Sequence, residues 1–171
     1  MFRVIALVLL SLLGGTPAFA DAKSECEATN TSADRRIVGC SAVIDGDARA
    51  VWAYLNRGIA YDNKKDYDRA IADFDKAIEV NPNYANAYNL RGNAYDNKKD
   101  NDRAIADYNK AIDIDPKFAP AYNNRGFFYR NKGDYDRAIA DFDKAIDIQP
   151  TVGRYINRGI AYERKGDTQR A

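Results

Sequence analysis

The sequence repeats with a period of 34 residues. Proline, glycine and tyrosine each return at this interval, at Pro82, Pro116 and Pro150, at Gly58, Gly92 and Gly126, and at Tyr61, Tyr95 and Tyr129. The string DYDRAIADFDKAI of residues 66–78 is identical to residues 134–146, so the period reflects a duplicated unit and not a fluctuation of composition. Self-similarity at this length predicts an all-α protein of stacked helical hairpins, an α-solenoid.

The composition is that of a chain that folds around a buried core. Apolar residues make up 46% and charged residues 30% of the 171 residues, and the formal net charge is +1. These values are ordinary for a globular protein, and the acidic and basic side chains are interleaved along the sequence. Such a chain has no electrostatic footprint for DNA, RNA or anionic lipid, so we expect no nucleic-acid partner.

Residues 1–20 have the pattern of an export signal. Arg3 supplies the positive start, residues 4–13 form an apolar run, and Ala18, Phe19 and Ala20 form a small-residue cleavage site. The run is shorter than the roughly 20 residues that a membrane-spanning helix needs. We therefore expect cleavage after Ala20 and a mature protein that is periplasmic or secreted, without membrane insertion; an uncleaved membrane anchor is the alternative.

Cys26 and Cys40 are the only cysteines, and both precede the first complete unit. In an oxidising compartment an even pair most often forms a disulfide, and closing a loop of this length contributes on the order of 3 kcal/mol by chain entropy. A redox-active pair and a zinc site are the alternatives. The two cysteines lack C-x-x-C spacing and the chain has no histidine, so a Cys26–Cys40 disulfide is the favoured prediction.

Each unit reads as two helices that pack closely. Counting Val51 as place 1, glycine at place 8 allows two helices to approach where a Cβ atom would intrude. In the second helix an apolar stripe follows helical spacing with small residues at the close contacts. The stripe comprises Ala70, Ile71, Phe74, Ala77 and Ile78 and their equivalents in the next two units.

Aspartates mark where the second helices begin. Asp66, Asp100 and Asp134 stand where a carboxylate caps a helix. A calcium site is the alternative, but the glycine and distal glutamate of an EF-hand loop do not follow. The preceding helices end at Gly133 and Gly166 in the later units, which are natural left-handed caps, whereas Lys65 and Lys99 fill that place earlier.

The set Tyr54, Gly58, Tyr61, Ala70, Phe74, Ala77 and Pro82 resembles the signature of the tetratricopeptide repeat family. The resemblance holds through three units, 51–84, 85–118 and 119–152, and departs at place 7, where Arg57, Arg91 and Arg125 replace the usual leucine. It implies a right-handed superhelix of antiparallel helix pairs, with the first helices lining a concave groove.

Incomplete units flank the three full ones. Residues 21–50 read as a degenerate half-repeat, with Cys40 at the place of the aromatic, which a disulfide to Cys26 would turn into an amino-terminal cap. Residues 153–171 begin a partial fourth unit. Its lone helix is itself the cap, or the sequence is a truncated copy of a longer protein, or the open face docks on another molecule; these readings stay open.

Asparagine dominates the places that line the groove in this family. The predicted peptide-binding residues are Asn56, Asn89, Asn93, Asn123, Asn124, Phe127 and Asn157. A row of amides can pair with the main chain of an extended peptide, since an amide both donates and accepts. The alternative is that asparagine is merely tolerated on an exposed helical face. For Leu90 and Trp52, core packing is favoured over a pocket for a guest.

The residues predict no enzyme, no cofactor and no metal. There is no histidine, no phosphate-binding loop and no recognisable nucleophile motif. The preferred function is a non-catalytic adaptor or scaffold that binds a protein or peptide in the groove, as a monomer or with weak self-association. The alternative is a structural subunit of an envelope assembly that contacts its partners through the convex face or the open carboxyl end.

Overall fold

Helices account for nearly all of the chain that the computed structural model describes, which is residues 17–167 and Arg170. They are α1 (Pro17–Glu27), α2 (Ala33–Gly46), α3 (Val51–Asn63), α4 (Tyr67–Val80), α5 (Ala85–Asn97), α6 (Asn101–Ile114), α7 (Ala119–Asn131), α8 (Tyr135–Ile148) and α9 (Val152–Lys165). No strand occurs in this range, which confirms the all-α prediction. Most of the predicted leader, residues 1–16, lies outside the described residues, and the predicted cleavage point after Ala20 falls within α1.

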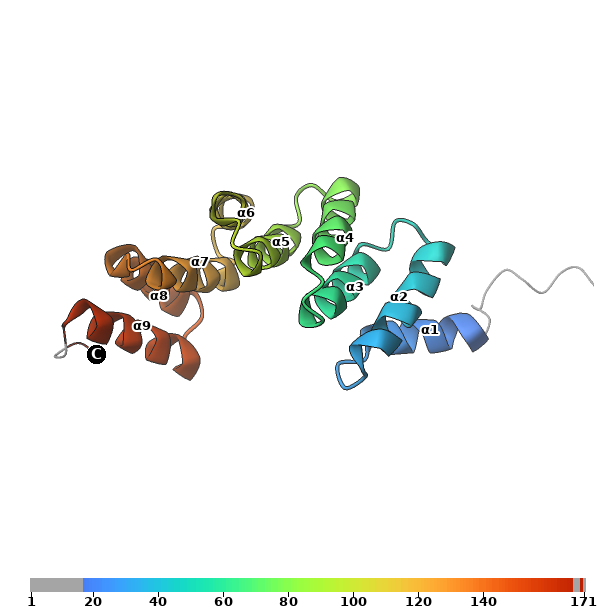
Figure 1. The fold of residues 1–171 in the computed structure, drawn as a ribbon, viewed down its shortest axis with the longest axis horizontal. Helices are drawn as coiled ribbons and strands as arrows, with labels where there is room; N and C mark the ends of the chain where they lie inside the picture. Colours follow the sequence, from blue (N-terminus) through green and yellow to red (C-terminus); the bar gives the residue numbers. More distant parts are fainter. Residues whose placement is uncertain (1–16, 168–169, 171) are drawn as a thin grey trace, which may run out of the picture.

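The helices form consecutive hairpins arranged as an arch (Figure 1). Each helix packs on the next along the chain, and each odd-numbered helix also contacts the following odd-numbered helix. No such contact joins successive even-numbered helices in the described part of the chain. The odd-numbered helices, which are the first helices of the hairpins, therefore line the inner curve, and the even-numbered helices fan out on the convex side.

The glycine at place 8 makes the close approach that the sequence predicts. A Cβ atom added to Gly58 would lie 2.5 Å from Phe74 Cε1, and one added to Gly92 would lie 2.8 Å from Tyr108 Cε1. Gly126 faces Phe142 in the same way. These rings and the alanines of the predicted stripe are buried, so each hairpin core is an aromatic ring seated against a glycine.

The predicted helix boundaries are confirmed. Asp66, Asp100 and Asp134 are the N-caps of α4, α6 and α8, and each side chain accepts a hydrogen bond from the backbone N–H three residues on, at 3.1–3.2 Å. The turns before these caps have positive φ at Lys65, Lys99 and Gly133, and α9 ends at Gly166 in the same conformation. Two lysines thus adopt the left-handed conformation that glycine supplies in the later units.

A further hairpin, α1 and α2, precedes the first full unit. Cys26 and Cys40 are fully buried between these helices with their sulfur atoms 2.00 Å apart, the spacing of a disulfide. Gly39 lets α2 approach the backbone of α1, since a Cβ atom there would lie 2.7 Å from the carbonyl oxygen of Ala22. The cysteine pair thus occupies the position that an aromatic ring holds in the later hairpins.

Candidate peptide-binding groove

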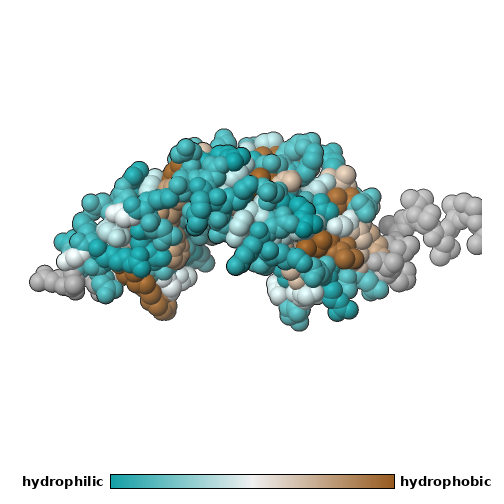
Figure 2. Space-filling view, in the orientation of Figure 1, coloured by the Kyte–Doolittle hydropathy of each residue, from teal (hydrophilic) through white to brown (hydrophobic). Residues whose placement is uncertain are grey.

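The inner curve of the arch is a hollowed, mostly hydrophilic surface. Figure 2 shows the hollow on the lower side of the molecule, between the two ends of the arch. We call this concave surface, formed by α3, α5, α7 and α9, the groove. The asparagines predicted to bind a peptide lie on these four helices.

Places 5 and 6 meet across each junction between units. Leu55 at place 5 of the first unit packs in the same cluster as Leu90 at place 6 of the second. At the next junction Asn124 Nδ2 donates to Asn89 Oδ1 at 3.0 Å. At the last described junction Asn157 Nδ2 donates to Asn123 Oδ1 at 3.3 Å. Each junction therefore pairs two side chains of the same kind, either two leucines or two asparagines. Leu90 interrupts the asparagine series at place 6, and its partner at place 5 is also a leucine, Leu55.

The structure distributes the predicted asparagines between the groove surface and the interior. Asn89 is only 4% exposed, and Asn93 Oδ1 accepts a hydrogen bond from the Tyr108 hydroxyl at 2.9 Å. Asn56, Asn93, Asn123, Asn124 and Asn157 are half-buried, so part of each side chain is accessible to a guest. Since an amide has two donor and two acceptor positions, the hydrogen bonds within the array leave these side chains further positions with which to bind a guest. Their binding of a peptide stays a prediction.

The seventh predicted residue, Phe127, lies partly buried at place 9 of α7. Its ring packs edge-on against Phe142, with centroids 5.6 Å apart. The guanidinium carbon of Arg130 lies 4.5 Å from the centroid of the Phe127 ring. Leu90 and Trp52 pack against the neighbouring core clusters, in agreement with the core reading of these two residues.

Charge changes sign along the groove. Place 12 is Asp62 in the first unit, Asp96 in the second and Arg130 in the third. Asp62 accepts a hydrogen bond from Asn97 Nδ2 at 3.2 Å, and burial raises the pKa of the Asp62 carboxyl. Arg130 has the opposite charge at the equivalent place of the third unit, and Glu163 is acidic again in the partial unit, so the positive charge at place 12 is confined to the third unit.

The arginine at place 7 has a role that the sequence analysis missed. Arg91 donates from Nε and Nη2 to both carboxylate oxygens of the buried Asp107, at 2.8 and 2.7 Å. The hydrogen bonds to Asp107 raise the pKa of Arg91, which keeps the guanidinium charged. Its Nη1 reaches Asp75 on the preceding second helix at 2.5 Å. Arg57 and Arg125 bind Asp73 and Asp141 in the same bidentate way.

This arrangement, which we call the arginine clasp, joins the two helices of a hairpin to the hairpin before. The signal was available in the sequence as an arginine and an aspartate that stay 16 residues apart in every full unit. In the partial unit Arg158 contacts Asp143 of α8 at 2.7 Å and has no bidentate partner among the described residues. The same helix leaves Val152 76% and Ile156 55% exposed.

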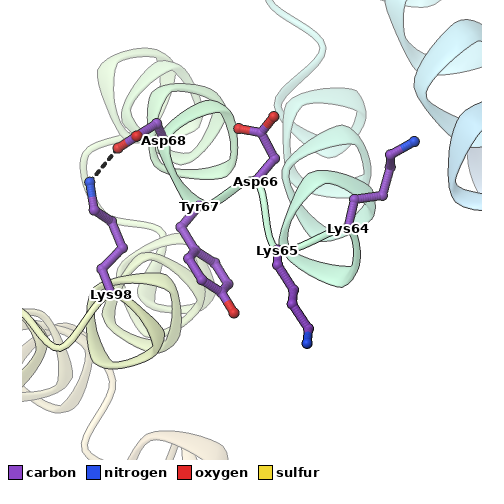
Figure 3. Close-up of a pocket in the computed structure, with 6 residues that line it drawn as sticks. All are labelled: Lys64, Lys65, Asp66, Tyr67, Asp68 and Lys98. Atoms are coloured by element: carbon purple, nitrogen blue, oxygen red, sulfur yellow. Dashed lines mark hydrogen bonds and ion pairs between the residues drawn. The ribbon is translucent and has the colours of Figure 1, made fainter.

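A shallow pocket of about 300 Å³ lies away from the groove, at the turn between α3 and α4 (Figure 3). Its lining residues are Lys64, Lys65, Asp66, Tyr67, Asp68 and Lys98. Asp68 pairs with Lys98, and Asp66 caps α4 and pairs with Arg69. The charges in this pocket are therefore largely used to cap a helix and to join neighbouring units.

Neither a membrane-spanning helix nor a metal-binding cluster occurs in the described part of the chain. None of its helices has the length and apolar character that crossing a bilayer requires. Within the same residues, no cluster of three or more histidine, cysteine or acidic side chains is suited to hold a metal ion.

Comparison with known proteins identifies the family of the repeat. The sequence pattern of the tetratricopeptide repeat matches residues 51–84, 85–118 and 119–152. No curated protein sequence matches the chain. A crystal structure of MamA is similar at 29% identity, with 81% of each chain covered and a TM-score of 0.68.

Two other solved structures extend this likeness. The tetratricopeptide repeat domain of Arabidopsis OM64 is 26% identical, with 67% of this chain and 95% of that chain covered and a TM-score of 0.60. A tetratricopeptide repeat protein of Thermus thermophilus is 17% identical, with 81% of this chain and 77% of that chain covered and a TM-score of 0.72. At that identity the last structure supports the fold alone.

Proposed function

Because this chain belongs to the tetratricopeptide repeat family, whose fold is typical of protein-interaction adaptors, we propose that it binds another protein or an extended peptide in the groove. The observation that carries the proposal is the row of half-buried amides that α3, α7 and α9 present on the concave surface. Proteins of this family are generally non-catalytic scaffolds, and binding without catalysis is the activity that we assign to this one.

The amides suit a guest that is read mainly through its backbone. Asn56 and Asn124 occupy place 6 of the first and third units, and Asn157 holds the same place in the partial unit, whose pattern begins one residue early. Asn124 and Asn157 each donate once to a neighbouring amide, which fixes their orientation and leaves hydrogen-bonding positions toward the groove. A pre-oriented amide loses less side-chain entropy when it binds than a freely rotating one.

We also propose that the adaptor works outside the cytoplasm. The proposal rests on the leader-like pattern of residues 1–20 and on the buried cysteine pair, which an oxidising compartment would keep as a disulfide. Amino-terminal sequencing of the protein recovered from the periplasm or the medium tests it. A chain that begins at Asp21 is expected, and a cytoplasmic protein that retains Met1 would contradict the proposal.

Site-specific cross-linking in the cells that produce the protein tests the groove. A photoreactive side chain at position 56 is expected to trap a partner, whereas one at position 110, exposed on α6, is not. The Asn56, Asn124 and Asn157 to alanine variant should retain at least about tenfold less partner, since each amide contributes roughly 1 kcal/mol. The matched control changes three lysines of the convex side, Lys76, Lys110 and Lys144, to alanine.

Cross-linking through the convex side and not through the groove would favour the alternative function, a structural subunit of an envelope assembly. Exposed apolar residues on α9, among them Val152 and Ile156, are the observation in its support. In that case cross-links would map to α9 or to the convex lysines, and the groove variant would bind normally. The single variant Asn56→Ala, which removes no hydrogen bond to another side chain in the described residues, guards against loss of folding in the triple variant.

A further inference from the structure

The last described helix, α9, is placed as the first helix of a hairpin. It packs on α8 and contacts α7, as each earlier first helix packs on the hairpin before it. Its outer side lies at the end of the arch, where Figure 2 shows apolar surface. Tyr155 at place 4 and Ile156 at place 5 are 48% and 55% exposed, whereas Tyr54 and Leu55 at these places of the first unit are 8% and 5% exposed. Within the described residues α9 is thus half of a hairpin that no second helix covers.

Gly159 is the position on α9 that corresponds to the contact with an aromatic ring. The glycines at place 8 of the full units are buried beneath a ring of their own second helix, with the nearest ring carbon 2.5–2.8 Å from an added Cβ atom. Gly159 holds the same place in the partial unit and is only half-buried. It therefore provides the same flat surface for a ring, and part of that surface is open to solvent.

Arg158 is held as one half of an arginine clasp. Its Nη1 donates to Asp143 of the preceding second helix at 2.7 Å, as Nη1 of Arg91 does to Asp75. Its guanidinium carbon lies 5.4 Å from the centroid of the Tyr155 ring, the distance found for Arg91 and the place 4 tyrosine of its unit. Nε and Nη2 of Arg158 have no hydrogen-bond partner in the described residues. In the full units these two nitrogens bind the aspartate that directly precedes the ring.

We propose that α9 binds an amphipathic helix of a partner protein, in which an aspartate directly precedes an aromatic residue. The three full hairpins show the chemistry that fits. The aspartate binds the arginine, the ring lies against the glycine, and alanines four residues before and three residues after the ring let the helices approach. These residues are Ala70, Asp73, Phe74 and Ala77 in the first unit, with equivalents in the next two. The surface is the end of the array, so this interaction does not depend on what the groove holds.

The charge of α9 is complementary to such a helix. The basic residues of α9 are Arg154, Arg158, Arg164 and Lys165, against Glu163 alone. Second helices have the opposite balance, since α8 has Asp136, Asp141, Asp143 and Asp147 against Arg137 and Lys144. A purely apolar helix would bury the Arg158 guanidinium without an acid, and an acidic segment without a ring would leave the apolar side chains of α9 exposed. A helix with adjacent aspartate and aromatic residues meets both requirements.

Nuclear magnetic resonance on the full, oxidised, ¹⁵N-labelled chain tests the inference with a synthetic helix. The probe is the blocked peptide DYDRAIADFDKAIDI, which is residues 134–148 of this chain. We expect saturable shifts of the Gly159 amide and of the Arg158 Nε–H, with the side-chain amides of Asn56 and Asn124 unmoved. Peptides with Phe142→Ala or Asp141→Asn should bind at least about tenfold more weakly, because they lack the ring or the charged partner of the arginine.

Two pairs of variants test the site from the side of the protein. Gly159→Ala should weaken binding about tenfold because its methyl group takes the place of the ring, whereas Gly153→Ala, at an exposed position of α9, should change it less than about twofold. Neither should lower the thermal midpoint of the free chain, since alanine favours a helix more than glycine does. Arg158→Gln should weaken binding about tenfold, and Arg154→Gln, one turn earlier, less than about twofold.

Absence of saturable binding, equal binding of the natural and Phe142→Ala peptides, or equal effects within either pair of variants would each overturn the assignment. Peptide shifts at Asn56 and Asn124 in place of α9 would locate the helix in the groove and would contradict it as well. Shifts of the Gly159 amide with protein concentration, without peptide, would identify a second copy of this chain as the occupant and not a partner protein. The cross-links at position 56 test the adaptor function separately, so that either proposal can fail alone.

Discussion

At the scale of single residues, the glycine at place 8 sets how closely the two helices of a hairpin approach. Alanine normally stabilises a helix relative to glycine by up to about 1 kcal/mol. At Gly92 that gain is opposed because a Cβ atom would lie 2.8 Å from the ring of Tyr108 and 3.3 Å from the carbonyl oxygen of Ala104. The ring is buried, so the helices have to move apart, and overpacking outweighs helix propensity.

Gly92→Ala is therefore expected to lower stability by about 1–3 kcal/mol, or several degrees in thermal midpoint. Gly153→Ala is the matched control, because Gly153 also lies in a helix and nothing stands within 4 Å of the added methyl group. We expect the control to be neutral or slightly stabilising in thermal unfolding followed by circular dichroism. Equal midpoints for the two variants would show that the ring does not enforce the close approach.

At the scale of the helix, the N-caps predict how stability depends on pH. Hydrogen bonds from the Arg69, Arg103 and Arg137 side chains hold the pKa values of Asp66, Asp100 and Asp134 below the ordinary 3.8. A carboxyl whose pKa is lower in the folded state stabilises the fold above its unfolded pKa, and that contribution is lost as the pH falls through the folded pKa. We expect the midpoint of thermal unfolding to fall between about pH 4 and pH 2.

The triple variant with asparagine at the three caps isolates this effect. Asparagine still accepts the backbone hydrogen bond, so the helices keep a cap, but it cannot titrate. The variant should be less stable than the natural chain at pH 7, where it lacks the ion pairs, and the difference should shrink toward pH 2. Melting curves measured across that range check the prediction, and a constant difference at all pH values would contradict it.

The sequence predicted the elements well because their signals lie within one unit. Asp100 and Gly133 specify a helix start and a helix end from their own neighbours, and Gly58 with Phe74 specifies a packing contact within one hairpin. The groove was harder to predict, because Asn89 meets Asn124 of the following unit and Asn93 meets Tyr108 of the second helix. Which residues meet between units depends on how far each first helix is shifted along its neighbour. The positions that line the groove in this family do not specify that shift.

The arginine clasp was missed for a related reason. Leucine is the usual residue at place 7, so the departure at Arg91 is visible in the sequence, but its partner Asp107 lies on the second helix, outside the places that the repeat signature specifies. A buried arginine needs a buried acid, so an arginine at place 7 indicates an acidic partner nearby. The constant spacing of 16 residues between the two would have identified it.

At the scale of the whole molecule, the stability of a solenoid is the sum of its units and of the junctions between them. The described junctions differ in chemistry, since Leu55 packs against Leu90 where the next junction joins Asn89 to Asn124 by a hydrogen bond. A leucine opposite an asparagine at a junction would leave the buried amide without a hydrogen-bond partner. Two leucines or two asparagines leave no polar group unpaired in this way. The junction pairs therefore match each unit to its neighbour in the chain.

A double-mutant cycle at the second junction tests this directly. Asn124→Leu alone is expected to cost about 1–3 kcal/mol in urea unfolding, because it removes the hydrogen-bond partner of Asn89 inside the array. Adding Asn89→Leu should restore much of that loss by recreating the Leu55–Leu90 arrangement, with a coupling energy above about 1 kcal/mol. Asn56→Leu is the matched control, since Asn56 also holds place 6 but bonds to no amide in the described residues. Additive single effects would show that the amides at places 5 and 6 do not act as a pair.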